Sequence, residues 1–243
     1  MGNYNFDYSS LSASISKRAL KVIPKSRQFE YDGNEHGLIS NEIFYADPDD
    51  ESKEGLLTNH YVDVNKGGVT WSANNKALEV TDEPIVVNVE KIRITSATIY
   101  GDANDVTKNY DIDYNTTANL EVYPLTIYVN VVGKNAGCDG LDIIQYDGKE
   151  KSVSGYEVAE APDITTGKLT NKFDANKLYP QPNDCVAKGT DPGNYELQYE
   201  GEVLSSDKFN YNDKNINCIV TYTTGKLVIS KKNLGIRVNA AKN

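Results

Sequence analysis

The sequence predicts an all-β protein that contains two β-sandwich domains in tandem. Strand-forming residues are plentiful, with 17 tyrosines in 243 residues, whereas a single methionine, a single tryptophan and the lack of leucine-rich helical stripes argue against helices. A six-residue phrase also occurs three times, as NYNFDY, NYDIDY and NCIVTY, beginning at Asn3, Asn109 and Asn217. The copies lie 106 and 108 residues apart. That is the length of a domain, whereas solenoid repeats run to roughly 20 to 50 residues.

The repeat period sets the expected domain boundaries. We expect one domain at residues 18–123 and a second at 124–231, because Pro124 lacks the N–H that a strand interior needs and so suits a junction. Residues 1–17 are interpreted as the closing strand or tail of a preceding repeat, and residues 232–243 as the opening strand of a following one. A phase in which the first domain begins at the first phrase satisfies the period equally. We therefore expect the chain to be a segment of a longer array.

Alternating hydrophobic residues predict two strands in each repeat. Every second residue of a strand faces the same side, and the middle copy of the phrase places Tyr110, Ile112 and Tyr114 on one face. A second alternating strand contains Leu20 in the first unit and Leu125 in the second, and we align these two leucines. Several such short strands in roughly 100 residues, separated by Gly, Pro, Asn and Asp, are typical of a β-sandwich.

A Tyr-Asp-Gly tripeptide recurs at residues 31–33 and 146–148 and predicts a turn, because glycine accepts a positive φ. It follows Leu20 by 11 residues but Leu125 by 21, which predicts an insertion of about ten residues in the second unit, around Cys138. Each unit also has an alternating strand after a turn in its middle. These strands are expected at residues 85–89 and 195–199.

The charge of the chain indicates which partners to expect. The formal charge is −10 and the pI is near 4.8, whereas nucleic acids and anionic membranes are bound through lysine and arginine. We therefore expect no nucleic-acid partner. No stretch of even 12 residues is continuously apolar, so no direct membrane insertion is expected within this chain either.

Signatures of catalysis are sparse. The histidines are His36 and His60, too few for a three-histidine metal site, and no serine lies in a Gly-x-Ser-x-Gly elbow. Carboxylates are abundant, but abundance does not place a pair of them across a cleft. We expect the chain not to be an enzyme and to hold no cofactor.

The order of the motifs resembles the YDG/MBG-type repeats of bacterial surface proteins. The shared series is an opening strand, Tyr-Asp-Gly, a Thr-Asp-containing turn, an alternating strand, and a phrase such as DVTKNY at 105–110 that leads to a closing strand. The resemblance covers nearly the whole chain. It departs at Glu83 and Pro84, where glycine is usual, and at residues 206–208, which replace Asp-Val-Thr.

The resemblance implies Ig-like modules in tandem, in an often wall-anchored adhesin of Gram-positive bacteria. It therefore implies an extracellular, cell-surface location and a non-catalytic role as a stalk or spacer, with neighbouring repeats of the same chain as partners. The alternative is a module whose divergent loops in the second domain bind a glycan or a host surface protein, since loops carry most of the difference between the units.

Acidic clusters are candidate calcium ligands. The first contains Asp47, Asp49 and Asp50, and the second contains Asp102 and Asp105. Carboxylate oxygens suit calcium, but neither cluster has the glycine turn and bidentate glutamate of an EF-hand loop. We therefore expect both clusters to be solvated turns that hold no metal, with calcium binding as the alternative.

All three cysteines lie in the second unit. Cys138 falls in the expected insertion and Cys185 in a polar turn, and we predict a disulfide between them because an exported protein tolerates one. Cys218 replaces the tyrosine of the other two phrases on the inward face of the strand. We expect it to be a buried free thiol.

Two further hypotheses concern the first unit. Trp71 alternates with Val69, so it is interpreted as a core residue, with a sugar-stacking platform as the alternative. Surface proteins of this class sometimes carry an internal Lys–Asn isopeptide bond. Lys21 and Asn119 are the kind of pair that such a bond would need, although the required carboxylate cannot be identified in the sequence.

Overall fold

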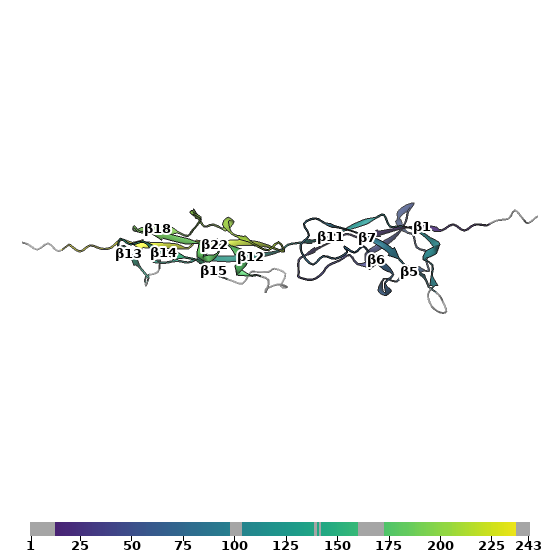
Figure 1. Ribbon diagram of the computed structural model, residues 1–243, viewed down its shortest axis with the longest axis horizontal. Helices are drawn as coiled ribbons and strands as arrows, with labels where there is room; N and C mark the ends of the chain where they lie inside the picture. Colours follow the sequence, from purple (N-terminus) through teal and green to yellow (C-terminus); the bar gives the residue numbers. More distant parts are fainter. Residues whose placement is uncertain (1–12, 98–103, 139, 141, 160–172, 237–243) are drawn as a thin grey trace, which may run out of the picture. The chain divides into compact units, whose positions relative to one another are not determined.

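The computed structural model describes residues 13–97, 104–138, 140, 142–159 and 173–236. Within these ranges the protein is all-β, as predicted: its helical elements are 3-10 turns of three residues each (Figure 1). No helix in the described part of the chain is long and apolar enough to span a membrane. The chain divides into two compact units, Met1–Phe29 with Gly33–Tyr123 and Glu30–Asp32 with Pro124–Asn243.

Unit 1 is built from two four-stranded sheets and a small third one. One sheet has the strand order β10-β1-β3-β4, the other has the order β2-β11-β7-β6, and β5-β8-β9 form the third. The strands are β1 (Arg18–Pro24), β2 (Arg27–Glu30), β3 (Ile43–Asp47), β4 (Asp50–Glu54), β5 (His60–Val62), β6 (Val69–Trp71), β7 (Ile85–Ile92), β8 (Ile94–Ser96), β9 (Asn104–Asp105), β10 (Tyr110–Asp113) and β11 (Thr117–Tyr123). The 3-10 turns are η1 (Ser40–Glu42), η2 (Val64–Lys66) and η3 (Thr107–Asn109).

Unit 2 contains shorter strands in more sheets, with the orders β15-β12-β22, β13-β23-β18, β14-β17-β19-β20 and β16-β21. Its strands are β12 (Leu125–Gly133), β13 (Ile144–Gln145), β14 (Lys151–Ser154), β15 (Tyr156–Val158), β16 (Leu178–Tyr179), β17 (Val186–Gly189), β18 (Gly193–Glu196), β19 (Gln198–Tyr199), β20 (Glu202–Val203), β21 (Asn210–Tyr211), β22 (Ile216–Thr223) and β23 (Lys226–Ser230). The 3-10 turns are η4 (Ala175–Lys177), η5 (Pro182–Asp184) and η6 (Ser206–Lys208).

Each unit buries a core between its sheets. In unit 1, Leu20 and Val22 of β1 pack in one cluster with Val89 and Ile92 of β7, which belongs to the opposite sheet. In unit 2, the alternating residues of β12 pack with Leu227 of β23 in the same way. The alternation in the sequence therefore identified the inward faces correctly. Two hydrophobic sheet faces packed on each other are the defining feature of a β-sandwich.

The phrase strand has the same place in both units. β10 runs parallel to β1, with Leu20 opposite Ile112, and β22 runs parallel to β12, with Val129 opposite Val220. Ile112 and Val220 occupy the same position of the phrase, so Leu20 corresponds to Val129. The alignment of Leu20 with Leu125 was therefore wrong by four residues. Hydrophobic alternation alone permits any even shift, because it repeats every two residues.

The corrected register also shortens the expected insertion. Eighteen residues separate Pro24 from Ile43, which are paired across β1 and β3, and 22 separate Gly133 from Tyr156, which are paired across β12 and β15. The second unit therefore carries about four extra residues over this whole connection. Up to Tyr-Asp-Gly the difference is six and not ten, because Tyr31 follows Leu20 by 11 residues and Tyr146 follows Val129 by 17. The predicted Tyr-Asp-Gly turns are confirmed by their backbones, because Gly33 has a φ of 81° and Gly148 a φ of 79°.

The structure differs from two expected strands, one at 195–199 and one at the C-terminal end of the chain. The strand expected at 195–199 is interrupted, because β18 ends at Glu196 and β19 begins at Gln198, with the buried Leu197 between them. At the chain ends, the described residues 231–236 form no strand, and Leu234 and Ile236 are 86% and 78% exposed. Residues 1–12 and 237–243, where further parts of the terminal strands were expected, lie outside the described residues.

Candidate functional site

The carboxylates of the acidic cluster predicted at residues 47–50 form contacts within their own turn between β3 and β4. The Asp47 Oδ1 accepts a hydrogen bond from the backbone N–H of Asp49 at 3.0 Å, and the Asp50 Oδ2 lies 2.6 Å from the Lys53 ammonium. The hydrogen bond from Lys53, followed by those from Ser52, lowers the pKa of Asp50 below its ordinary value. Carboxylates satisfied in this way favour the solvated-turn interpretation over calcium.

The second acidic cluster is described only in part. Asp102 lies outside the described residues, whereas Asp105 accepts a hydrogen bond from the backbone N–H of Thr107 at 3.0 Å. Its other oxygen lies 3.2 Å from the Nε of Arg93. Within the described ranges, no group of three or more His, Cys, Asp or Glu side chains is placed to hold a metal ion. Calcium binding by either cluster stays an alternative hypothesis.

The predicted disulfide is not formed in this structure. Cys185 is fully buried and donates to the backbone oxygen of Gln181 at 3.6 Å, whereas Cys138 is exposed and lies 3.7 Å from the backbone oxygen of Lys226. Cys218 is also a free thiol, as expected, and is partly buried. Burial raises the pKa of both the Cys185 and the Cys218 thiols to about 11, because it disfavours the charged thiolate. These two groups are therefore poor nucleophiles at neutral pH.

The residues singled out in unit 1 have structural partners. The Lys21 ammonium pairs with Glu51, and Asn119 lies on the exposed face of β11, so the structure shows no isopeptide bond between them. Trp71 packs against the core cluster and donates its Nε1–H to the Ser40 hydroxyl at 3.0 Å. These contacts fit the core interpretation of Trp71.

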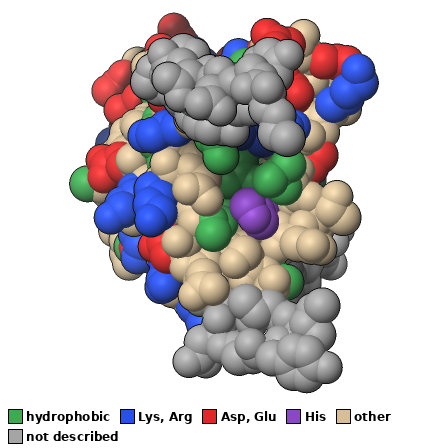
Figure 2. Space-filling view, turned by 90° about the vertical axis from the view of Figure 1, so that its right-hand side faces the viewer, with side chains coloured by type: hydrophobic (Ala, Val, Ile, Leu, Met, Phe, Trp, Pro, Cys, Tyr) green, Lys and Arg blue, Asp and Glu red, His purple; other side chains and the backbone are tan. Residues whose placement is uncertain are grey.

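The two histidines also take part in packing. His36 stacks on the Phe29 ring with centroids 4.2 Å apart, and the Nδ1 of His60 lies 2.6 Å from the Tyr110 hydroxyl. His60 lines a hollow of about 570 Å³ in unit 1 together with Tyr45, Leu57 and other residues. Figure 2 shows hydrophobic side chains gathered around a histidine on the face that it presents. The lining of this hollow mixes aliphatic and aromatic side chains with polar groups, among them Glu54 and Thr58.

A groove in unit 2 has a different lining. It measures about 600 Å³ and is formed by residues of β17, β18, β19 and β20, by the turn at Glu200 and Gly201, and by Asp184 of η5. Three carboxylates, one ammonium, two amides and a phenol line it, together with small and apolar residues. The lining residues are Asp184, Val186, Lys188, Asn194, Tyr195, Glu196, Gln198, Glu200, Gly201 and Val203.

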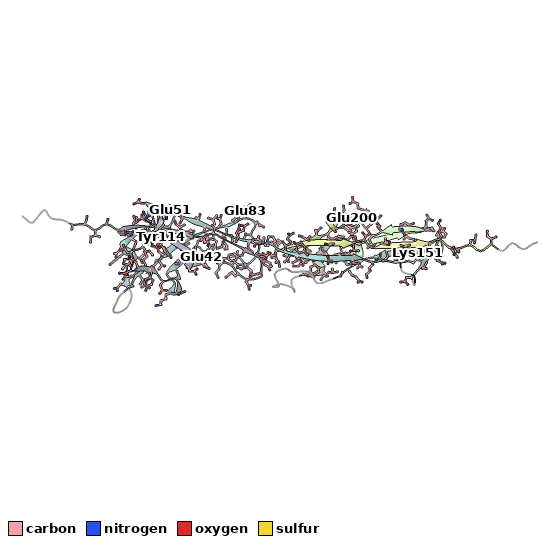
Figure 3. All side chains as sticks on the ribbon, turned by 180° about the vertical axis from the view of Figure 1, so that it is seen from behind. Glu42, Glu51, Glu83, Tyr114, Lys151 and Glu200 are labelled. Atoms are coloured by element: carbon pink, nitrogen blue, oxygen red, sulfur yellow. The ribbon has the colours of Figure 1, made fainter. Side chains whose placement is uncertain are left out.

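A two-residue hairpin turn holds Glu200 at this groove. Figure 3 labels Glu200 among the side chains of unit 2. β19 and β20 are paired up to Tyr199 and Glu202, and the two residues between them both have positive φ values, 51° for Glu200 and 86° for Gly201. Such a turn favours Asn or Gly at its first position, so Glu200 occupies a backbone conformation that costs of order 1–3 kcal/mol for an ordinary side chain. Its charge is the first cause that raises the pKa of Tyr199.

This arrangement can bind a polar ligand through many hydrogen bonds. Carboxylates accept them, the ammonium donates them, and amides do both, so Asn194 and Gln198 beside Lys188 suit a hydroxyl-rich or peptide-like group. This groove was not among the sites predicted from the sequence. Four short strands bring its residues together, whereas the sequence predicted one unbroken strand at 195–199 and no strand at β20. The Glu-Gly pair at 200–201 was the available signal.

Comparisons with known proteins place this chain in no family. No protein-family model matches it, and no curated protein matches it. Among solved structures, it is similar to one described as "Drosophila OTK, extracellular domains 3-5", with 10% sequence identity over 87% of this chain and a TM-score of 0.16. The chain spans 60% of the length of that protein chain. At this TM-score the likeness supports no statement about fold or function.

Proposed function

We propose that the chain is a non-catalytic repeat segment of a bacterial cell-surface protein, in which two Ig-like β-sandwich units act as an extracellular stalk or spacer. The observation that supports this most directly is the repeated scaffold: β1 and β10 in unit 1, and β12 and β22 in unit 2, form the same parallel pair with equivalent residues opposite each other. Arrays of similar modules suit projection and display.

The connection between the units favours a spacer over a flexible linker. β11 ends at Tyr123 and β12 begins at Leu125, so Pro124 is the only residue between the two strands. Proline has a fixed φ, and a one-residue connection leaves few backbone torsions for bending. Neighbouring repeats of the same chain are the partners that this role requires.

Small-angle scattering of the chain tests the spacer proposal. A variant with six Gly-Ser residues inserted between Tyr123 and Pro124 is the matched comparison, because it leaves both units unchanged. We expect the native chain to give a narrow distribution of maximum dimensions and the insertion variant a broad one. Equally broad distributions for both chains would contradict a spacer.

A second function is supported by the groove in unit 2. We propose it as the site at which the second domain binds a glycan or a host surface protein. A spacer requires neither a residue in a strained backbone conformation, such as Glu200, nor amide side chains that converge on a groove. A glycan array and a panel of host surface proteins, probed with the chain and with Glu200→Gln, test it. We expect at least tenfold weaker binding for the variant, and an unchanged affinity for the surface control Glu83→Gln in unit 1. Binding that both variants leave unchanged would exclude this groove.

A further inference from the structure

The outer face of β12 and β22 in unit 2 is a strip without charge. Tyr128 and Asn130 of β12 lie opposite Ile219 and Thr221 of β22, and all four are exposed. Asn217 extends the strip and donates its amide to the Thr126 hydroxyl at 3.3 Å across the two strands. We call this surface the uncharged strip; it consists of Thr126, Tyr128, Asn130, Asn217, Ile219, Thr221 and Thr223.

The equivalent face of unit 1 is charged. There, Ala19 lies opposite Asp111, and Lys21 lies opposite Asp113. Lys21 also pairs with Glu51 of β4. These positions correspond to those of the strip through the shared register of the phrase strands, so the same scaffold carries charged residues in one unit and uncharged residues in the other.

Exposing large side chains here is unfavourable for a protein in water. Tyr128 is 47% exposed and Ile219 is 42% exposed, and they are direct cross-strand neighbours. The equivalent pair in unit 1, Ala19 and Asp111, shows that the fold does not need a large apolar pair at these positions. An exposed aromatic and aliphatic pair flanked by amides and hydroxyls is typical of a binding surface.

The size of the strip favours a narrow ligand. The eight paired residues from Leu125 to Val132 span about 23 Å, and two strands are about 10 Å wide. This footprint is far below the roughly 800 Å² per partner that a stable protein–protein interface buries. Backbone N–H and C=O groups of β12 and β22 point along the sheet towards neighbouring strands, so a ligand lying on this face contacts side chains and gains no strand pairing. A linear chain lying along the strands fits these dimensions.

The chemistry of the strip identifies the class of that chain. A protein with a net charge of −10 attracts cations, but the strip itself offers no charge to an ionic ligand. A sugar ring presents C–H groups on its faces, which suit the Tyr128 ring, and hydroxyls at its edge, which suit Asn130 and Asn217. We propose that the uncharged strip binds a linear, neutral oligosaccharide. This goes beyond the spacer role and concerns a strand face that is separate from the groove residues.

An NMR titration of the whole chain tests this proposal, with cellohexaose, maltohexaose and chitohexaose as neutral probes and hexagalacturonate as the charged probe. We expect at least one neutral probe to shift the amide signals of β12 and β22, and the charged probe to bind at least tenfold more weakly. Tyr128→Ala and Ile219→Asp install the residues that unit 1 carries at these positions. Each is expected to weaken binding about tenfold or more.

The control is Tyr61→Ala, which removes a tyrosine of similar exposure, 41%, from unit 1 and should leave the affinity unchanged. Thermal unfolding of each variant checks that the fold is retained. The proposal is overturned if no neutral probe shifts β12 and β22, or if both strip variants bind as the native chain does. Concentration-dependent sedimentation that Ile219→Asp abolishes would assign the strip to a second copy of the chain and would also overturn it. None of these results bears on the scattering test of the spacer.

Discussion

Strand β10 of unit 1 and strand β22 of unit 2 hold the same place beside the first strand of their units, but their outer faces differ. β10 presents Asp111 and Asp113, whereas β22 presents Ile219 and Thr221 at the equivalent positions. Their inward residues remain apolar or aromatic in both units, and the inward Cys218 stands where unit 1 has Tyr110.

The comparison separates what the fold requires from what it permits. The inward positions must fill a sandwich core, so they keep their hydrophobic character. The outward positions contribute little to stability and can therefore acquire different chemistry. Two units in one chain thus serve as controls for each other, and each of the following variants has a counterpart in the same molecule.

Loss of a core leucine should lower the stability of a unit more than any other change considered below. Leu20 in unit 1 and Leu227 in unit 2 are both fully buried, each in the core cluster of its own unit. Leu20→Ala and Leu227→Ala should each lower the free energy of unfolding of their own unit by about 2–5 kcal/mol. Hydrogen exchange followed residue by residue measures this. Loss of protection in both units from one substitution would show that the cores are not separate.

A glycine contact specific to unit 2 should give the next largest effect. A Cβ placed on Gly133 would lie 2.3 Å from the backbone nitrogen of Gly225, which is closer than real contacts allow, whereas unit 1 has Pro24 at the equivalent position. We expect Gly133→Ala to destabilise unit 2 by about 2 kcal/mol. Denaturant titration measures it. Gly140→Ala is the control because nothing lies within 4 Å of its added Cβ; equal stability of the two variants would contradict the close approach.

Buried tyrosine hydroxyls should give opposite signs in the two units. The Tyr156 hydroxyl of unit 2 donates to the backbone oxygen of Pro180 at 2.7 Å, whereas the buried Tyr45 hydroxyl of unit 1 has no hydrogen-bond partner among the described residues. Tyr156→Phe should destabilise its unit by about 1–2 kcal/mol, and Tyr45→Phe should be neutral or stabilise its unit by up to about 1 kcal/mol. Thermal unfolding of the paired variants checks the signs. A clear loss of stability in Tyr45→Phe would mean that its hydroxyl is satisfied in solution.

The smallest perturbation is chemical labelling of the thiols, all of which belong to unit 2. Only the thiolate reacts, and the raised pKa values of about 11 keep Cys185 and Cys218 protonated at pH 8. Iodoacetamide should therefore modify the exposed Cys138 alone in the native protein and all three cysteines in denaturant. The rates at Cys185 and Cys218 should rise as the pH approaches 11. Mass spectrometry counts the labels. If only Cys218 were labelled in denaturant and neither Cys138 nor Cys185 reacted, the result would support the predicted disulfide between those two residues.

The class of fold and the inward faces followed from the sequence because both depend on a two-residue period. Leu20, Val22 and Tyr110 are buried where alternation places them. The exact alignment of the repeats did not follow, because the same alternation fits any even shift, and Leu125 was chosen where the ladder selects Val129. Register is determined by long-range pairing, which no local pattern contains.

The candidate sites could be predicted less well. The acidic clusters were visible in the sequence, but their turn hydrogen bonds, such as that between Asp47 and Asp49, depend on the backbone path. The groove around Glu200 depends on four short strands, of which the sequence predicted one continuous strand at 195–199 where the structure has parts of β18 and β19. Part of the uncharged strip could have been predicted, because Ile219 and Thr221 replace two aspartates of the phrase. That Tyr128 lies opposite Ile219 is known only from the strand pairing.

The two units share one parallel register at their phrase strands, and NMR contacts between backbone protons across these strands measure that register. We expect contacts that place Leu20 opposite Ile112 in unit 1 and Val129 opposite Val220 in unit 2. Contacts that place Leu125 opposite Val220, or an antiparallel pattern in either unit, would contradict the equivalence of the two units and the assignment of the strip.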